Sequence, residues 1–175
     1  MKRMVLLCVA VLLFAFPPSA SSTLINGGFE AGDFTGWSQN VPTGGEAGVA
    51  TGHSGSSGTI YLPVEGQYFA LLKTDGPDNY TTISQSIDLL AGDVLTGWAA
   101  FDYSDYSPYN DNAYVHIVDD TGTVVATPWD EYGTDHESYW DGPWTFWNFT
   151  PPQAGNYQIE FGVANNLVSC PRNKG

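Results

Sequence analysis

Two acidic segments rich in aromatic residues carry most of the side chains that could bind a ligand. Residues 102–112 read DYSDYSPYNDN, and residues 127–144 read TPWDEYGTDHESYWDGPW. Aromatic rings can stack on the CH faces of a sugar, while carboxylates and amides bind its hydroxyl groups. The candidate ligand-binding residues are therefore Tyr106, Tyr109, Trp129, Tyr132 and Trp140. The alternative for these rings is packing at the ends of a folded domain.

The same segments hold enough carboxylates for the paired acids of glycoside hydrolysis. These acids are Asp102, Asp105, Asp111, Asp130, Glu131, Glu137 and Asp141. Their spacing marks no two of them as an acid and a nucleophile, and acids this dense in loops usually face solvent or bind calcium. The chain also lacks the GxSxG, HExxH and CxxC patterns and a phosphate-binding glycine loop. A glycoside hydrolase is therefore the least favoured of three hypotheses for the function. The other two are non-catalytic: a glycan-binding module and a structural surface or matrix protein.

Residues 1–22 have the pattern of a secretory signal peptide. Lys2 and Arg3 precede an apolar run at 5–16, and small residues follow at 19–22. The run is short for a transmembrane helix and fits the apolar part of a leader. We expect a signal-peptide helix that is removed on export, which leaves a secreted protein that is extracellular or periplasmic and no longer attached to a membrane. Only Cys170 then remains, so the mature chain can form no intrachain disulfide.

The charge balance is strongly acidic. The chain has 5 Lys and Arg against 19 Asp and Glu, for a net charge of −14. Lys73 is the only basic side chain between Asn26 and Ser169. Phosphate binding needs clustered Lys and Arg, so the composition argues against nucleic acid and against anionic membranes as partners. Acid-rich loops instead suit calcium, neutral sugars or simple solubility.

Short strands separated by turns are predicted after the leader. Residues 81–89 alternate in period two, with Ile83, Gln85, Ile87 and Leu89 on one face. Further strands are expected at 67–74, 95–103, 113–119, 124–125, 144–150 and 157–164. Residues 41–58 predict a long loop or an irregular strand with His53 in solvent, and the aromatic residues of 144–150 are expected to pack in the core. No helical period is found, so we expect one all-β sandwich or barrel.

A family resemblance narrows the fold. NGGFE at 26–30 followed by GW at 36–37, and later LKTDG, SQSI, AGD and WNFTPPQAGNY, resemble jelly-roll carbohydrate-binding modules of the galactose-binding-like type. They also resemble exported PEP-CTERM-type proteins. The resemblance implies a jelly-roll β-sandwich over residues 23–166 and Glu30 as a ligand of a structural Ca2+ ion. The residues themselves leave a second option for Glu30, which is capping a backbone turn or facing water.

The end of the chain departs from that family. Residues 167–175 read LVSCPRNKG, where the resemblance implies a last apolar strand with an aspartate and then a sorting tail. We expect an irregular tail, an unpaired sheet edge and a marginal fold, as in a truncated or frameshifted product. The resemblance implies a non-catalytic module that binds an extracellular glycan or exopolysaccharide. The alternative is a structural surface or matrix protein without a specific sugar ligand.

Overall fold

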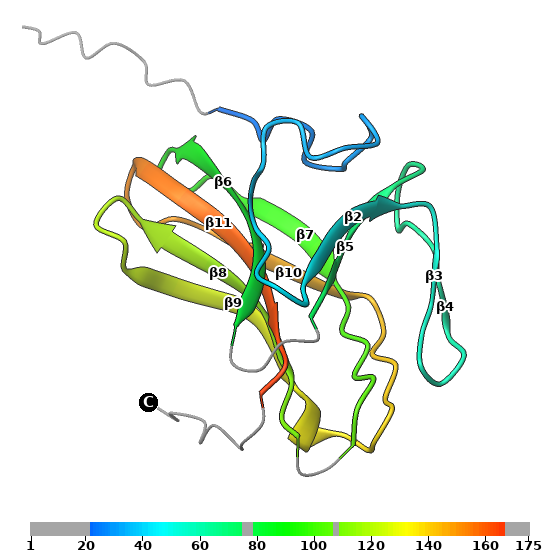
Figure 1. Cartoon of the computed structure of the whole chain (residues 1–175). Helices are drawn as coiled ribbons and strands as arrows, with labels where there is room; N and C mark the ends of the chain where they lie inside the picture. Colours follow the sequence, from blue (N-terminus) through cyan, green and yellow to red (C-terminus); the bar gives the residue numbers. More distant parts are fainter. Residues whose placement is uncertain (1–21, 75–78, 107–108, 167–175) are drawn as a thin grey trace, which may run out of the picture.

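The computed structural model describes residues 22–74, 79–106 and 109–166 (Figure 1). Within these residues the chain forms strands and one short 3₁₀ helix, and no α-helix. The elements are β1 (Ser38–Asn40), β2 (Glu46–Ala50), β3 (His53–Ser54), β4 (Ile60–Tyr61), β5 (Phe69–Lys73), β6 (Tyr80–Leu89), β7 (Leu95–Ala99), β8 (Asn112–Asp119), β9 (Val124–Tyr132), the 3₁₀ helix Gly133–Asp135, β10 (Thr145–Phe149) and β11 (Gly155–Ala164). The expected all-β fold is confirmed. The expected signal-peptide helix and the tail at 167–175 lie outside the described residues.

One layer is a five-stranded antiparallel sheet in the order β1-β6-β11-β8-β9. Its long central strand β11 pairs with β6 on one side and with β8 on the other. β6 alternates as the sequence predicts, because Ile83, Ile87 and Leu89 are buried while Asp88 faces solvent. Gln85, on the same buried face, exchanges two hydrogen bonds with the backbone of Ile25. The N-terminal segment is thereby attached to the sheet.

The facing layer consists of two ribbons, β7–β10 and β2–β5, with the β3–β4 hairpin beside them (Figure 1). The core lies between the layers, where Val115 and Ile117 of β8 pack in one cluster with Leu95 of β7 and Trp147 of β10. The chain crosses repeatedly from one layer to the other, as in a jelly-roll sandwich. A side chain at Gly97 of β7 would approach the Trp147 ring to 2.4 Å, so a glycine is needed where that ring lies against the strand.

The second layer has open edges among the described strands. β5 is hydrogen-bonded to β2 and β7 to β10, and the two ribbons share no ladder. Residues that point into the core near these edges are only partly buried, among them Leu72 of β5 and Phe161 and Val163 of β11. A sandwich whose second layer is split in this way covers its core less completely than two continuous sheets would.

The glycine-rich start of the domain folds into consecutive turns. Asn26, Phe29, Gly32 and Gly36 have positive φ angles. These turns bring Phe29 to 5.1 Å from Trp37, measured between ring centroids, and the Trp37 indole donates to the Asn26 carbonyl oxygen at 3.2 Å. Trp37 is buried in the core cluster. The segment therefore anchors the domain through aromatic packing, as its spacing of aromatic residues suggests.

Several strand boundaries differ from the sequence-based expectations. Part of 41–58 forms β2, because Glu46–Ala50 finds a partner in β5, far away along the chain. β7 ends at Ala99, and Phe101 and Tyr103 are buried in the segment that follows it. β9 continues to Tyr132, well beyond the predicted strand at 124–125. Pairing between strands decided these boundaries, with β2 paired to β5, β7 to β10 and β9 to its hairpin neighbour β8, and the local pattern of one strand does not report how far its pairing extends.

Candidate functional site

The two aromatic, acidic segments meet at one end of the sandwich. We call residues 100–111 the β7–β8 segment and residues 133–144 the β9–β10 segment. The N–H of Tyr103 donates to the Trp140 carbonyl oxygen at 2.8 Å, and the N–H of Tyr139 donates to that of Asp105 at 2.9 Å. Gly142 also donates to Phe101 at 2.8 Å. Backbone hydrogen bonds therefore hold the two segments together and fix the side chains that they present.

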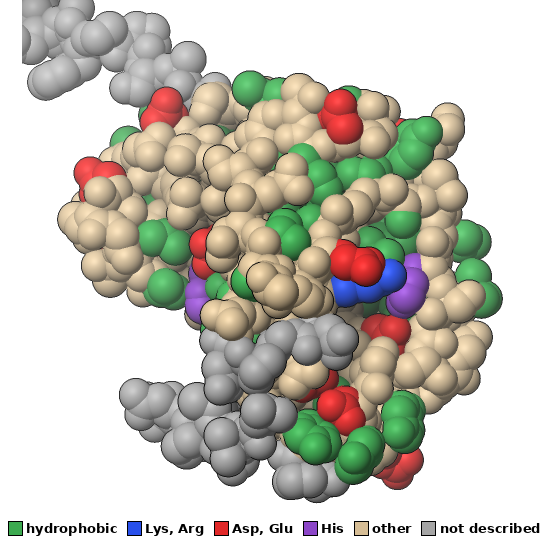
Figure 2. Space-filling model, in the orientation of Figure 1, with side chains coloured by type: hydrophobic (Ala, Val, Ile, Leu, Met, Phe, Trp, Pro, Cys, Tyr) green, Lys and Arg blue, Asp and Glu red, His purple; other side chains and the backbone are tan. Residues whose placement is uncertain are grey.

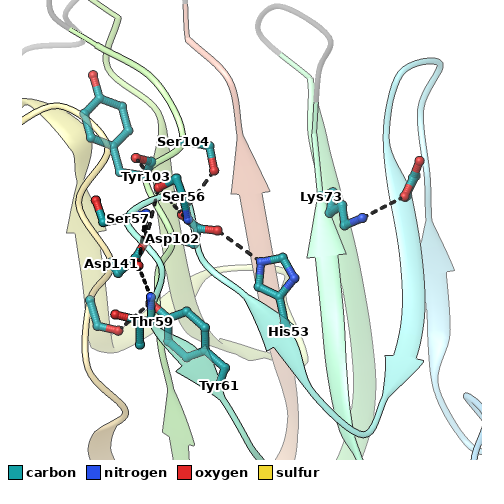
Figure 3. Close-up of polar contacts among 12 residues, drawn as sticks. His53, Ser56, Ser57, Thr59, Tyr61, Lys73, Asp102, Tyr103, Ser104 and Asp141 are labelled. Atoms are coloured by element: carbon teal, nitrogen blue, oxygen red, sulfur yellow. Dashed lines mark hydrogen bonds and ion pairs between the residues drawn. The ribbon is translucent and has the colours of Figure 1, made fainter.

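The turn between β3 and β4 is hydrogen-bonded to both segments at this end (Figure 3). Asp141 accepts backbone N–H groups from Ser57 at 3.1 Å and Thr59 at 2.8 Å, and Asp102 accepts from Ser56 and lies 3.0 Å from Nε2 of His53. Burial acts to raise the pKa of Asp141, but the N–H donors of Ser57 and Thr59 outweigh it and lower that pKa to about 2. The β3–β4 turn is thus fastened to both segments.

The position of His53 corrects the expectation of a solvated loop histidine. It lies on β3, its side chain is 24% exposed, and its ring pairs with Asp102. Its ring also stacks on Tyr61, whose hydroxyl donates to the Gly142 carbonyl oxygen at 2.8 Å. The partner of His53 lies 49 positions away in the sequence, so no local pattern could indicate it.

Tyrosine rings are exposed at the tip of the two segments. Tyr106 is 49% and Tyr139 is 48% exposed, and half-buried Tyr109 meets Tyr106 edge-on at 5.3 Å between ring centroids. We call Tyr106, Tyr109 and Tyr139 the tyrosine cluster. Figure 2 shows hydrophobic and acidic side chains side by side at this end of the molecule. The tyrosine cluster thus presents apolar ring surface beside the carboxylates of the two segments, which is the chemistry predicted for sugar binding.

Behind the cluster lies a polar layer that is mostly buried. The buried Tyr103 hydroxyl donates to the Tyr109 carbonyl oxygen at 2.7 Å, and burial raises its pKa to about 12. Asn110 accepts from the hydroxyl and the N–H of Thr134. Burial, with a smaller contribution from Asp105, raises the pKa of Asp111 to about 6. The tyrosine cluster therefore rests on a base ordered by hydrogen bonds, which also contains one buried acid.

The structure divides the five candidate binding residues. Tyr106 and Tyr109 belong to the tyrosine cluster, whereas Trp129 is 9% exposed and packs in the core from β9. Trp140 is half-buried and stacks on His136 at 3.5 Å between ring centroids, while His136 bonds Glu131 at 2.8 Å. Tyr132, at the end of β9, is partly buried opposite Asn112. Tyr139 completes the exposed set, and its position in an aromatic, acidic segment was the only sequence signal for it.

A second aromatic pair lies on the outer face of the β7–β10 ribbon. Trp98 and Phe146 are exposed, face each other across the ladder and contact at 5.3 Å between ring centroids. This corrects the expectation that the aromatics of 144–150 all enter the core. Adjacent residues of a strand point to opposite faces, so Trp147 is buried while Phe146 is not.

Glu30 acts as a cap in the structure. Its carboxylate accepts the backbone N–H of Gln67 at 3.0 Å and that of Tyr68 at 3.2 Å. Gly66, which precedes these two residues, has a φ angle of 70°, a conformation that favours glycine. Among the described residues, no group of three or more His, Cys, Asp or Glu side chains is arranged to hold a metal ion. In the same residues, no helix is long and apolar enough to cross a membrane.

Comparisons with known proteins identify no family. No family model matches the chain, and no curated protein matches it. Two solved structures are similar over most of its length. The enzymatically active domain of tailspike protein 4 from bacteriophage CBA120 has 16% identity and a TM-score of 0.45, with 80% of this chain and 19% of that chain covered. The N-terminal tandem CBM22 domain of Xyn10C from Paenibacillus barcinonensis has 17% identity and a TM-score of 0.38, with 92% and 49% covered. The chain thus spans less than half the length of either.

Proposed function

We propose that the protein is a non-catalytic carbohydrate-binding module that acts at the cell exterior and holds a neutral glycan, such as an exopolysaccharide. The observation that carries the proposal is the exposed tyrosine cluster, fixed at one end of a β-sandwich among carboxylates and amides. Exposed rings on an ordered base lose little conformational entropy on binding, which favours stacking on a sugar ring.

The charge of this end defines the class of glycan. Asp102, Asp105, Asp135, Glu137 and Asp141 belong to the segments at this end. Lys73, which pairs with Glu46 at 3.3 Å, is the one Lys or Arg among the described residues. Carboxylates accept hydrogen bonds from sugar hydroxyls and repel uronic acids and sulfate groups. The site should therefore bind uncharged polysaccharides and reject polyanionic ones.

The hydrogen bonds that Asp141 and Asp102 already make within the protein support a binding role over a catalytic one. Asp141 accepts three backbone N–H contacts from Ser57 and Thr59, and Asp102 is bonded to Ser56 and His53. A pair of glycosidase acids must instead be aimed at the scissile bond from both sides. These two carboxylates serve to position the turn beside the tyrosine cluster.

The proposal is tested by glycan binding with matched aromatic variants. Wild-type protein is screened by affinity electrophoresis against neutral and uronic-acid polysaccharides, and hits are quantified by calorimetry. Tyr106→Ala and Tyr139→Ala should each weaken binding about tenfold or more, since stacked aromatics dominate such sites. Trp98→Ala and Phe146→Ala, which remove exposed rings elsewhere, should leave the affinity unchanged. Binding that is lost only in the Trp98 or Phe146 variants would place the site on the β7–β10 face and contradict the proposal.

A structural surface or matrix role is the second candidate, and specific contacts favour it. Trp129 packs in the core and Trp140 stacks on His136, so two of the five candidate rings serve the fold. If wild-type protein binds no polysaccharide in the screen while remaining folded, this second role replaces the first.

A further inference from the structure

Tyr139 has a backbone conformation that is unfavourable for a residue with a side chain. Its φ angle is 60°, in the left-handed region that glycine adopts readily and in which a bulky residue is strained. Asn26 and Phe29 are the other described non-glycine residues with a positive φ angle, and the Phe29 ring packs against the core cluster. The Tyr139 ring is 48% exposed and lies outside that cluster. Core packing therefore offsets the strain at Phe29 and does not offset it at Tyr139.

Hydrogen bonds from two segments hold Tyr139 in this conformation. The N–H of Tyr139 donates to the Asp105 carbonyl oxygen at 2.9 Å, and the Ser57 hydroxyl donates to the Tyr139 carbonyl oxygen. The N–H of Ser57 also donates to the Asp141 carboxylate at 3.1 Å, so the β3–β4 turn is bonded to the chain on both sides of Trp140 (Figure 3). A strained residue persists where its surroundings fix it from several directions, as they do here.

Asp105 connects the Tyr139 ring to its neighbour in the tyrosine cluster. Its carbonyl oxygen accepts the Tyr139 N–H, and its carboxylate accepts the N–H of Tyr106 at 2.8 Å. The two most exposed rings of the tyrosine cluster, one from each segment, are thus attached to the same residue. Rings whose relative position is fixed before a ligand arrives lose less conformational entropy on binding.

We propose that Ser57 is a positioning residue of the glycan site, because its hydroxyl keeps Tyr139 in the left-handed conformation that presents its ring beside Tyr106. The inference rests on the proposed glycan-binding function and adds to it a residue that acts through Tyr139. Ser57 is exposed, and its bond to Asp141 is made by the backbone, so removal of the hydroxyl leaves no cavity and keeps that bond. The effect of a substitution should therefore appear in the mobility of Tyr139 and in glycan affinity, and much less in stability.

The first test measures how firmly Tyr139 is held, without any ligand. In Ser57→Ala, protection of the Tyr139 amide from hydrogen exchange, followed by NMR, should fall about threefold or more, since one of two backbone restraints is lost. Ser57→Thr keeps the hydroxyl and should retain the wild-type protection. Ser86→Ala, at an exposed position of β6, is the matched control and should also retain it. Unchanged protection in Ser57→Ala overturns the proposal.

The second test measures the strain at Tyr139 by comparing glycine with alanine. Tyr139→Gly should have a higher thermal midpoint than Tyr139→Ala, because glycine adopts a positive φ angle at no steric cost. Glu137 is an exposed residue of the same segment and is not among those with a positive φ angle, so there Glu137→Gly should be no more stable than Glu137→Ala. If Tyr139→Gly is the less stable of the two Tyr139 variants, no strain needs to be held and the proposal is wrong.

The third test measures glycan affinity by calorimetry, with galactomannan, mixed-linkage β-glucan and dextran as neutral probes. Ser57→Ala should weaken binding about threefold to tenfold, the loss expected for one hydrogen bond, while Ser57→Thr and Ser86→Ala should keep the wild-type affinity. Weaker binding in Tyr139→Ala with wild-type affinity in Ser57→Ala would leave the glycan site in place and refute the positioning role. Wild-type protein that binds none of the probes would refute the proposed function, and with it the role of Ser57 in binding.

Discussion

Many acidic residues of this protein act as hydrogen-bond acceptors for backbone turns. Asp33 accepts from Thr35, Asp93 from Leu90, and Asp119 from Thr121 and Thr123. Glu30 and Asp141 do the same across long sequence distances. Charged acceptors form stronger hydrogen bonds than neutral ones. Part of the acidic composition is therefore structural, in addition to the solubility, sugar or calcium roles that composition alone suggests.

Asp141 allows a prediction about pH. Its pKa in the folded protein is lowered to about 2, below the unfolded value, so its contribution to stability is present above about pH 4 and lost as the pH falls through the folded pKa. Asp141→Asn should be less stable than wild type near pH 6, and the difference should shrink toward pH 2.5.

Urea denaturation of both proteins across this range measures the Asp141 effect. Asp120→Asn, at an exposed turn residue, provides the matched control and should follow wild type at each pH. A difference between wild type and Asp141→Asn that stays constant with pH would show that the carboxylate charge does not anchor the β3–β4 turn.

At the scale of elements, one layer of the sandwich is a continuous sheet and the other is divided into separate ribbons. The five-stranded sheet is continuous, and the middle of β8 is fully buried at Val115 and Ile117. The second layer is two ribbons, and the core residues beneath their open edges are half-buried. Stability should therefore be concentrated in β6, β11 and β8, and the β2–β5 ribbon should exchange its amide hydrogens sooner.

Two substitutions in the neighbouring strands β8 and β9 test where the stability of the sandwich is concentrated. Ile117→Ala, at the centre of β8, should lower the free energy of unfolding by about 2–5 kcal/mol because it leaves a cavity. Val124→Ala, on the adjoining edge strand β9, removes an exposed side chain and should change it by less than about 0.5 kcal/mol. Urea denaturation at neutral pH compares the two. Equal losses would contradict the placement of the core between the layers.

At the scale of the whole molecule, one sign of charge dominates. The chain has a net charge of −14, and the described residues contain a single Lys and no Arg. Like charges repel across the compact state and destabilise it, and dissolved salt screens that repulsion. The same imbalance agrees with the proposal of a neutral glycan as the ligand.

Screening gives a prediction for the intact protein. Raising the ionic strength from about 20 mM to about 0.5 M shortens the screening length from roughly 20 Å to roughly 4 Å, so the thermal midpoint should rise. Sodium chloride and potassium chloride should act alike, because screening depends on ionic strength and not on the identity of the cation. A midpoint that falls with salt would mean that attractive pairs such as Lys73 with Glu46 outweigh the net repulsion.

The sequence by itself determined the fold class and the location of the candidate site. Alternation in 81–89 predicted the buried face of β6, because period two places every second residue on one side of a strand. The composition of 102–112 and 127–144 predicted an aromatic, acidic surface, and the two segments do meet. These features are local in the chain, so a local pattern can report them.

Only the tertiary structure decided which rings are exposed and which acids are occupied. Trp129 and Tyr139 have similar surroundings in the sequence, but β9 carries Trp129 into the core and the β9–β10 segment leaves Tyr139 at the surface. His53 meets Asp102 across 49 positions and Ser56 meets Asp141 across 85, and Asp111 has a buried oxygen without a hydrogen-bond partner among the described residues. The physical reason is that burial and hydrogen bonding depend on which distant strands pair, and no period in the local sequence encodes that choice.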